Sequence, residues 1–225
     1  MIKKLFKIIL KAVLWFFIIS IVSVLFFRFF PIPITPLMVI RVVEQKIKGE
    51  KVKLKHNWTP LENISKNLQL AVVASEDQNF FIHNGFDLKA IEKAMKNNSK
   101  RKKIKGASTI SQQTAKNVFL WPSRSYIRKG FEVYFTFLIE MCWSKRRIME
   151  VYLNSIEMGN GIYGAAAATE YWYKKRPSNI SQQEAAGIAA ILPNPRRYKA
   201  NSLSPYSIKR RNAIINQMNY MTIVY

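Results

Sequence analysis

One apolar segment near the N-terminus is the strongest constraint on how this chain can fold. Residues 12–27 are sixteen consecutive positions without a charge. A helix that crosses a membrane needs about twenty residues, and residues 8–30 supply that length if the side chains of Lys11 and Arg28 extend to the two interfaces. We therefore predict a single transmembrane anchor over residues 12–30.

Two other interpretations of this segment are a cleaved signal peptide and a buried core helix. The segment is long and bulky, and no small-x-small cleavage site follows it, which argues against a signal peptide. Its clusters of Phe and Trp argue against a core helix. Residues 1–11 contain four lysines and no acid, so the positive-inside rule predicts that this basic segment is cytoplasmic and that the rest of the chain faces outward.

The charge of the whole chain indicates an anionic partner. Thirty-six Lys and Arg residues outnumber thirteen Asp and Glu residues, which gives a formal net charge of +23. Nucleic acid, a membrane surface and a phosphorylated substrate all fit this balance. Cys142 is the only cysteine, which excludes an internal disulfide and a cysteine-based metal cluster. No metal site in the protein is predicted.

Apolar periodicity and capping residues predict that the chain is nearly all helix. We expect seven or more helices, with no internal repeat and no βαβ pattern. Thr35-Pro36 should begin a helix that ends at Gly49. A second helix should begin at Thr59-Pro60-Leu61-Glu62, which reads as an N-cap, a Pro and a Glu in the first turn, and end near Glu76. Further N-caps are expected at Asp87, Ser108 or Thr109, Ser125, Ser181 and Ser204.

These helices define a fold of the mainly α class, a helical domain on a single N-terminal transmembrane helix. Residues 31–58 are predicted to form a membrane-proximal linker and lobe, and residues 59–225 the main domain. Residues 51–58 alternate apolar and polar side chains, as in a short strand or an extended connection. His56 in this stretch is interpreted as a packing or surface residue. Three apolar side chains of the lobe are expected to enter the bilayer: Leu37, Met38 and Trp58.

The densest group of chemically active side chains follows the helix that is expected to end near Glu76. Its sequence is Glu-Asp-Gln-Asn-Phe-Phe-Ile-His-Asn-Gly-Phe-Asp, residues 76–87. A carboxylate where a buried helix ends can be partly desolvated and tuned as an acid or base. Glu76 is therefore the candidate general base. The other motif residues are expected to shape the loop, with Asp77 accepting backbone N–H bonds: Asp77, Phe80, His83, Gly85 and Asp87.

Two further polar stretches suit a substrate that carries sugars and phosphates. The first, residues 106–117, places amides and a lysine near a helix N-terminus, where sugar hydroxyls and phosphate oxygens can be bound. The second, residues 128–132, has Glu132 four residues after an arginine, which fits either a surface ion pair or charges that line a cleft. The basic run 100–105 is expected to be a solvated loop that attracts anionic groups. The candidate substrate-binding residues are Ser108, Gln112, Gln113, Lys116, Asn117, Arg128 and Lys129.

Together these stretches resemble the five signatures of the peptidoglycan glycosyltransferases, a family shared with the front half of class A penicillin-binding proteins. Residues 76–87 fit E-D-x-x-F-x-x-H-x-G-x-D, residues 106–117 fit G-x-S-T-I-x-Q-Q-x-x-K-N, residues 128–140 begin with R-K-x-x-E, residues 145–154 resemble K-x-x-I-L-E-x-Y-L-N with Met149 for Leu, and residues 159–164 resemble the glycine-rich fifth signature. We do not interpret this GxGxxG as a dinucleotide fingerprint, because no strand is predicted before it.

The resemblance implies a lysozyme-like helical fold and an inverting transfer that builds glycan chains from lipid II. It implies Glu76 as base and Glu132 as a second catalytic residue, which positions cations or a divalent ion around the diphosphate. Lys116, Arg128 and Lys129 would neutralise the leaving diphosphate. No cofactor is required, although Mg or Mn at the diphosphate is compatible.

The same resemblance implies a monofunctional enzyme in the cell inner membrane, because no transpeptidase domain follows and the Pro-rich linker is similar to that of Gram-negative enzymes. Its expected partners are lipid II, the growing glycan strand, the membrane, and cell-division or elongation proteins.

Two other functional classes compete with this interpretation. A lysozyme-like hydrolase or lytic transglycosylase shares a helical fold and a catalytic Glu, but does not need cations arranged for a diphosphate. A membrane-tethered nucleic-acid binder fits the charge, but no nucleic-acid-binding motif is present. The predicted topology also puts the basic domain outside the cytoplasm.

Overall fold

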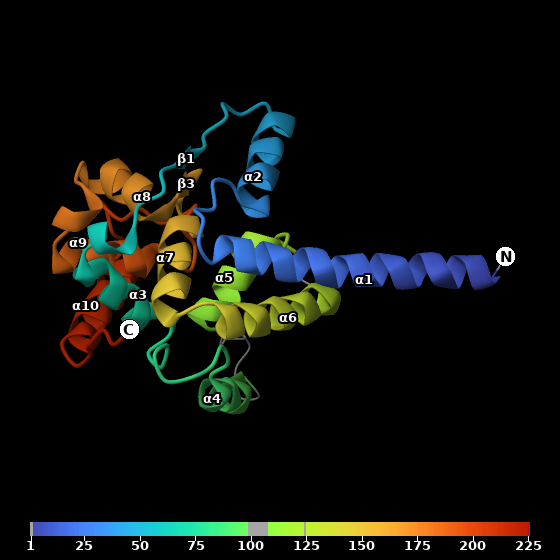
Figure 1. The fold of residues 1–225 in the computed structure, drawn as a ribbon. Coiled ribbons are helices and arrows are strands. Elements are labelled where there is room, and N and C mark those ends of the chain that lie inside the picture. The colour runs from blue at the N-terminus through green and yellow to red at the C-terminus, as the bar shows by residue number, and fades with distance from the viewer. Residues whose placement is uncertain (1, 99–107, 124) are drawn as a thin grey trace.

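A computed structural model describes residues 2–98, 108–123 and 125–225 and confirms the mainly α class (Figure 1). The helices in these residues are α1 (Ile2–Phe27), α2 (Pro36–Ile47), α3 (Lys66–Glu76), α4 (Leu88–Asn98), α5 (Ile110–Phe119), α6 (Tyr126–Cys142), α7 (Lys145–Ser155), α8 (Gly164–Tyr173), α9 (Gln182–Ile191) and α10 (Pro205–Met218). The strands are β1 (Lys55–His56), β2 (Glu157–Gly159) and β3 (Ile162–Tyr163), and two 3-10 turns lie at Leu61–Asn63 and Pro177–Asn179.

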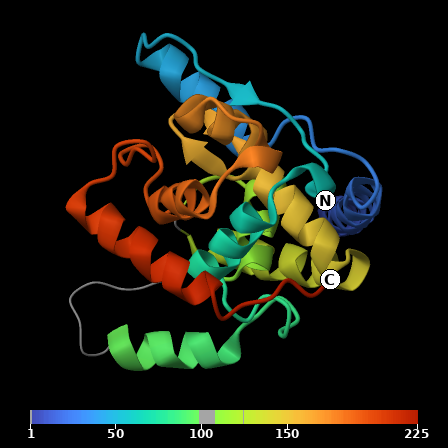
Figure 2. The same ribbon diagram turned by 90° about the vertical axis from the view of Figure 1, so that its left-hand side faces the viewer.

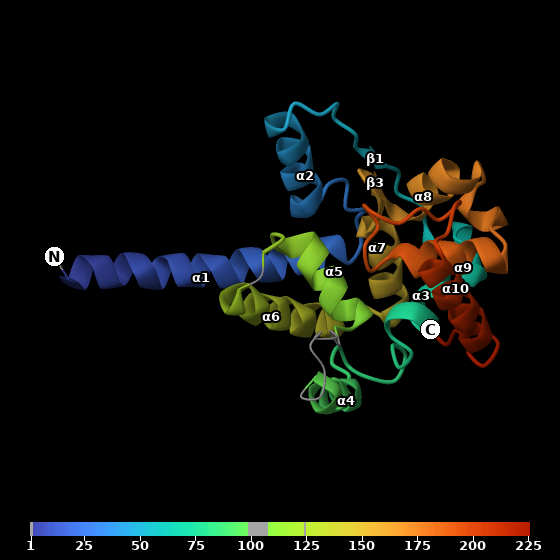
Figure 3. The same ribbon diagram turned by 180° about the vertical axis from the view of Figure 1, so that it is seen from behind.

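Helix α1 projects from the domain and is long and apolar enough to cross a membrane (Figure 1). It ends at Phe27 rather than at residue 30. Its last turns pack along α6, which runs beside it in both front and back views (Figures 1 and 3). Trp143 at the end of α6 donates from Nε1 to the carbonyl of Val24 at 2.8 Å, and Ser20 shares a 2.7 Å hydrogen bond with the Tyr134 hydroxyl. The C-terminal end of α1 is therefore part of the packed structure.

The main domain is built from two groups of helices that meet at the candidate site. Helix α9 packs against α3 and α10, and α5 packs against α6 and α7. Helix α4 lies apart from both groups, below α10 in the view of Figure 2. The buried core runs through these contacts and includes the fully buried side chains of Leu68, Ile139, Ile148 and Tyr152. This packing fixes the positions of the helices that carry the candidate site: α3, α5, α6 and α10.

Most helix starts follow the sequence prediction, because a side-chain oxygen accepts from a free N–H of the first turn. This holds at Thr35, Asp87, Thr109, Ser125, Ser181 and Ser204. The start predicted at Thr59 is wrong. Asn154 binds both backbone groups of Thr59 at 2.8 and 2.9 Å, Ile64 is extended, and α3 begins after the N-cap Ser65.

The three strands form a small sheet in the order β1-β3-β2 that the sequence did not predict as a sheet. Strands β2 and β3 are an antiparallel hairpin around the glycine-rich turn, and β1 adds in parallel to β3. A strand does therefore precede the GxGxxG, contrary to the reason given above, but it belongs to a hairpin and not to a βαβ unit. Gly161 has φ +68°, and a Cβ there would lie 2.2 Å from the Lys53 carbonyl oxygen.

Helix α2 and the segment after it form the lobe beside α1. Two apolar side chains of this lobe that were expected to enter the bilayer are packed inside the protein. Met38 is 1% exposed, and Trp58 is partly buried against the core with Arg147 over its ring. Neither side chain is free to enter a bilayer. The apolar side chains that α2 exposes are Val39 and Val43, one turn apart, and Ile47.

Asn154→Ala is expected to lower the melting temperature by about 6 to 12 °C. The fully buried Asn154 side chain bonds the amide and carbonyl of Thr59 and the carbonyl of Glu150, and its loss leaves buried polar groups without partners, which costs about 3 kcal/mol. Differential scanning fluorimetry in detergent measures the effect, with the exposed Asn216→Ala as the matched control. Equal melting temperatures for the two variants would contradict this role.

Candidate active site

Glu76 is the last residue of α3, as predicted, and its carboxylate is held by three donors. The Ser75 hydroxyl lies 2.9 Å and Arg210 Nη2 3.2 Å from Oε1, while Gln113 Nε2 lies 3.1 Å from Oε2. Arg210 comes from α10 and also donates to the Ser75 hydroxyl at 2.7 Å. The surroundings are thus more polar than the partly desolvated setting that was predicted. The side chain keeps 15% of its surface exposed, so a substrate can reach it.

The loop after Glu76 is held by Asp77, as expected. Its carboxylate accepts from the Ile110 amide at the start of α5 and from His83 Nε2, both at 2.9 Å. The Gly85 amide donates to His83 Nδ1, which places the histidine proton on Nε2, facing Asp77. These bonds join the loop to α5 and fix the direction in which Glu76 points.

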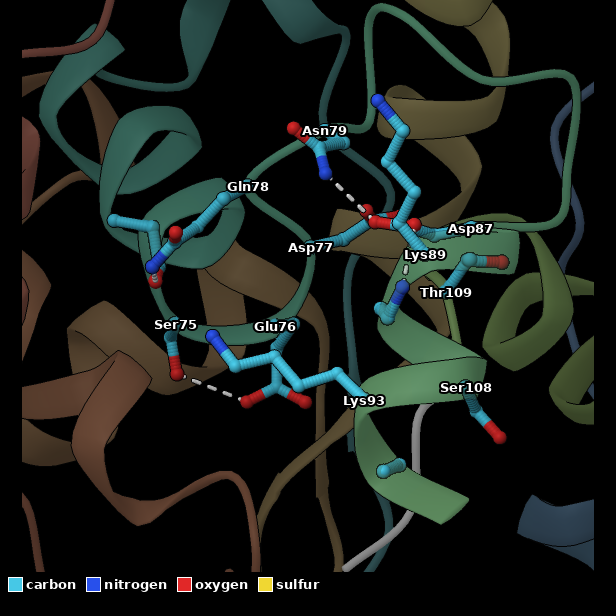
Figure 4. Close-up of a pocket in the computed structure, with 13 residues that line it drawn as sticks. Ser75, Glu76, Asp77, Gln78, Asn79, Asp87, Lys89, Lys93, Ser108 and Thr109 are labelled. Carbon is cyan, nitrogen blue, oxygen red and sulfur yellow. Dashed lines mark hydrogen bonds between the residues drawn. The ribbon is translucent and has the colours of Figure 1, made fainter. Parts of the chain in front are cut away.

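The other loop residues of the motif make contacts within the loop and with the helices around it. Phe80 is fully buried. Asp87 accepts from Asn79 Nδ2 at 2.7 Å and from the Ala90 amide at 2.8 Å, which caps α4 (Figure 4). Gly85 has φ +86°, and a Cβ there would lie 2.9 Å from Glu140 Cγ. The structure brings these side chains to the loop and none of them next to the Glu76 carboxylate.

A cavity of about 530 Å³, which we call the Glu76 pocket, opens beside this carboxylate (Figure 4). Helix α4 contributes two lysines that sequence reasoning missed, Lys89 and Lys93, and Lys93 extends across the pocket in Figure 4. Ser108, a predicted substrate-binding residue, is exposed and lines this pocket. The Glu76 pocket therefore combines three carboxylates, those of Glu76, Asp77 and Asp87, with two lysines and several hydroxyl groups, and these groups suit a polyol that carries negative charge.

A second cavity of about 510 Å³, which we call the Lys116 pocket, is lined by α5 together with α2, β2 and the start of α6. Four predicted substrate-binding residues line it: Gln113, Lys116, Asn117 and Arg128. Gln113 connects the two pockets, because it lines the second and donates to Glu76 in the first. A ligand in the Lys116 pocket would thus lie close to the Glu76 carboxylate.

The Lys116 ammonium on α5 is attracted by two carboxylates, those of Glu132 and Glu76. Burial lowers its pKa below the usual value, the attraction of Glu132 and Glu76 opposes this, and the nearby Arg128 and Lys129 add to the lowering. Among the described residues, no ion-pair partner lies within 4.0 Å of it. A partly buried cation without a close counterion is a binding group for an anion.

Glu132 lines neither pocket and is 2% exposed. Its two carboxylate oxygens are paired with Arg128, at 2.5 Å, and with Lys129. Glu132 thus lies beside the cations that it was predicted to position, and its side chain does not reach either pocket. The ion pair fixes the Arg128 guanidinium against Glu132.

The residues present do not fit a divalent ion held by the protein at this site. Three cations, Arg41, Lys116 and Arg128, line the Lys116 pocket against a single carboxylate, Glu157. Within residues 2–98, 108–123 and 125–225 there is no group of three His, Cys, Asp or Glu side chains that could hold a metal.

Two of the predicted substrate-binding residues are placed elsewhere. Gln112 is 3% exposed, and its side-chain oxygen accepts from the Thr109 amide in a capping box, so it builds the start of α5 and does not reach a pocket. Lys129 lines neither pocket and pairs with Glu132. The run 100–105 lies outside the described residues. His56, half-buried, bonds the Asn154 carbonyl, and burial lowers its pKa, as expected of a packing residue.

Sequence reasoning missed the residues that reach the site from distant parts of the chain. Arg210 lies in a basic helix in which nothing local distinguishes it from Lys209 or Arg211. Arg41 and Glu157 were likewise missed, because neither belongs to a motif that was recognised as chemical.

Comparison with known proteins places the chain among enzymes of cell-wall synthesis. Residues 43–219 match the family described as Transglycosylase. A biosynthetic peptidoglycan transglycosylase of Bacteroides thetaiotaomicron is 55% identical over 97% of this chain and 88% of its own. Those of Bdellovibrio bacteriovorus and Pseudomonas syringae are 54% and 48% identical, over 94% and 98% of this chain and 85% and 94% of theirs.

Proposed function

This chain belongs to the transglycosylase family and is an enzyme of peptidoglycan synthesis, and we propose that it polymerises glycan chains from lipid II with release of undecaprenyl diphosphate. The observation that carries the proposal is the connection between the two pockets. The first contains the Glu76 carboxylate and the second is lined by three cations. Gln113 lines the second pocket and donates to Glu76 in the first. A glycosyl diphosphate needs cations at its phosphates and an acceptor hydroxyl activated beside its anomeric carbon.

The proposed step is a single displacement with inversion at the anomeric carbon of the donor MurNAc. The 4-hydroxyl of the acceptor GlcNAc forms the new C–O bond, its proton passes to the Glu76 carboxylate, and the bond from the anomeric carbon to the diphosphate breaks. Inverting glycosidases divide the work between two faces of the sugar in the same way. The product is a β-1,4 linkage.

The cations of the Lys116 pocket act on the leaving group. Lys116 and Arg128 stabilise the charge that develops on the departing diphosphate, a term that is large when the groups are held in place before the reaction. Glu132 holds Arg128 in that place at 2.5 Å. Gln113 and Asn117, which line the same pocket, are positioned to bind sugar or phosphate oxygens.

Polymerisation of labelled lipid II by the purified protein in detergent tests this function. We expect ladders of glycan chains that penicillin does not affect. A folded protein that gives no ladder, but releases fragments from finished peptidoglycan, would overturn the proposal in favour of a cleaving enzyme.

Arg210→Ala is expected to lower kcat by between about tenfold and a hundredfold with little change in KM. Arg210 fixes Glu76 and Ser75, and a small misplacement of a catalytic group has a cost of this size. The neighbouring exposed Lys209→Ala is the matched control for lost positive charge. Equal activity of the two variants would exclude a positioning role for Arg210.

We further propose that the enzyme is held in the inner membrane by α1, with its N-terminus in the cytoplasm and the domain in the periplasm. Support comes from α6, whose face opposite Arg128 and Glu132 exposes a stripe of large apolar side chains: Tyr126, Val133, Phe137 and Met141. Because α6 runs beside α1, this stripe would meet the same bilayer, which an apolar surface favours over water.

A fluorophore at position 137 should be quenched by lipids that carry spin labels and protected from iodide. The full-length protein with Cys142→Ser and Phe137→Cys is labelled and reconstituted in vesicles for this measurement. Lys209→Cys, on exposed α10 at the far side of the domain (Figure 1), is the control expected to show the reverse. Iodide quenching at position 137 equal to that at position 209 would rule out contact with the bilayer.

A further inference from the structure

The wall of the Lys116 pocket formed by α2 and β2 carries two charged residues that have no assigned role. Arg41 comes from α2 and Glu157 from the first residue of β2, and both line the pocket together with Lys116 and Arg128. These four residues come from four different elements. The pocket therefore has three cations rather than the two that the sequence motifs supply.

Arg41 is held in place without using all of its donors. Its Nη1 bonds Glu44 one turn along α2 at 2.6 Å, and its Nε lies 3.8 Å from Glu157 Oε2, too far for a hydrogen bond. The buried Nε has no hydrogen-bond partner in the described residues. Burial alone would lower the pKa of Arg41, but Glu44 and Glu157 outweigh it and raise the pKa, so the guanidinium is always charged. Its side chain stays 23% exposed.

Glu157 presents an oxygen that lacks a donor. The side chain is 9% exposed, yet Oε1 has no hydrogen-bond partner among the described residues, and neither does the hydroxyl of the fully buried Tyr163. Burial raises the pKa of Glu157, while Arg41 and the backbone N–H of Gly161 oppose this. A buried carboxylate oxygen without a donor is costly. A ligand hydroxyl or amide N–H in the pocket would satisfy it.

From this arrangement we infer that Arg41 is a third cation that binds the diphosphate in the Lys116 pocket, positioned by Glu44 and Glu157. The inference rests on the proposed function, because it takes that pocket as the site of the leaving group. A glycosyl diphosphate supplies both chemical partners that are missing, phosphate oxygens for Arg41 and a sugar hydroxyl or amide N–H for Glu157 Oε1. The guanidinium fork suits two phosphate oxygens at once.

The test is direct binding of geranyl diphosphate to the full-length protein in detergent, by isothermal titration calorimetry. Arg41→Ala is expected to weaken binding about tenfold, the usual loss for one charge-assisted hydrogen bond, and Arg41→Lys by less. Arg196→Ala is the matched control, because Arg196 also approaches Glu44, at 4.0 Å, but does not line the pocket. Geraniol, which lacks the diphosphate, should bind the parent and both alanine variants equally.

Three outcomes would overturn the inference. They are unchanged affinity of Arg41→Ala for geranyl diphosphate, an equal loss in Arg41→Ala and Arg196→Ala, and no binding of geranyl diphosphate by the parent. Melting temperatures identify a variant that is misfolded, and Arg41→Lys then decides. Failure of the proposed function is a separate result, since it is the absence of glycan ladders from lipid II and does not depend on this binding measurement.

Discussion

Glu76→Gln is expected to lower kcat for lipid II polymerisation by about 10²- to 10⁴-fold, the usual contribution of a general base. The amide has nearly the same shape and can still accept from Ser75 and Arg210, which hold Glu76 at 2.9 and 3.2 Å. It cannot take the proton of the acceptor hydroxyl. Binding of geranyl diphosphate should be retained, because the phosphates are bound by other residues.

The matched control is Glu62→Gln, which makes the same change at an exposed Glu paired only with Arg146. It should leave polymerisation within about twofold, as surface ion pairs contribute little. Glycan ladders from Glu76→Gln within tenfold of the parent rate would show that Glu76 is not the base. The cleaving class would gain support if the same variant still degraded finished peptidoglycan.

Lys116→Met is expected to lower kcat/KM by about 10²- to 10³-fold, in the range found when a preorganised charge-stabilising group is removed. The partly buried ammonium has no closer ion-pair partner in the described residues, so the diphosphate is its natural counterion. Met keeps the length of the side chain and removes the charge. The exposed Lys66→Met on α3 is the control and should retain the parent rate.

The same residue predicts a pH dependence. Because burial lowers the pKa of Lys116, its ammonium loses its proton at a lower pH than ordinary surface lysines do as the pH rises. In a plot of kcat/KM against pH, the alkaline decrease should therefore occur at a pH below the pKa of an exposed lysine. Lys116→Arg, which stays charged, should keep activity and shift that decrease to higher pH. An unchanged decrease in Lys116→Arg would assign it to another group.

The sequence predicted the features of the structure that depend on neighbouring residues in the chain. Helix starts at Thr35, Ser125 and Ser181 follow from residues within one turn, and so does the position of Glu76 at a helix end. The error at Thr59 came from Asn154, ninety-five residues away, which takes both backbone groups that a helix start would have used. No pattern within one segment reports such a contact.

The two adjacent glutamines of α5 make different contacts. Gln112 and Gln113 were predicted to share one role, yet one caps the helix and the other contacts Glu76. The spacing of Thr109 and Gln112 is that of a capping box and was a sufficient signal for Gln112. Arg210 and Arg41 could not be found this way, because tertiary packing brings Arg210 to Glu76 and Arg41 to the Lys116 pocket.

The hydrogen bond from Trp143 to the backbone of Val24 fixes the position of α6 relative to the end of α1. A flexible tether would let the domain change its distance from α1, whereas here the last turns of α1 are joined to α6 by hydrogen bonds at Tyr134 and Trp143. The charged residues at the start of α6 are therefore kept at a constant height relative to α1. Removing α1 would not simply release a soluble domain: it would expose the Trp143 indole and the aromatic face of α6, and aggregation would be the first result.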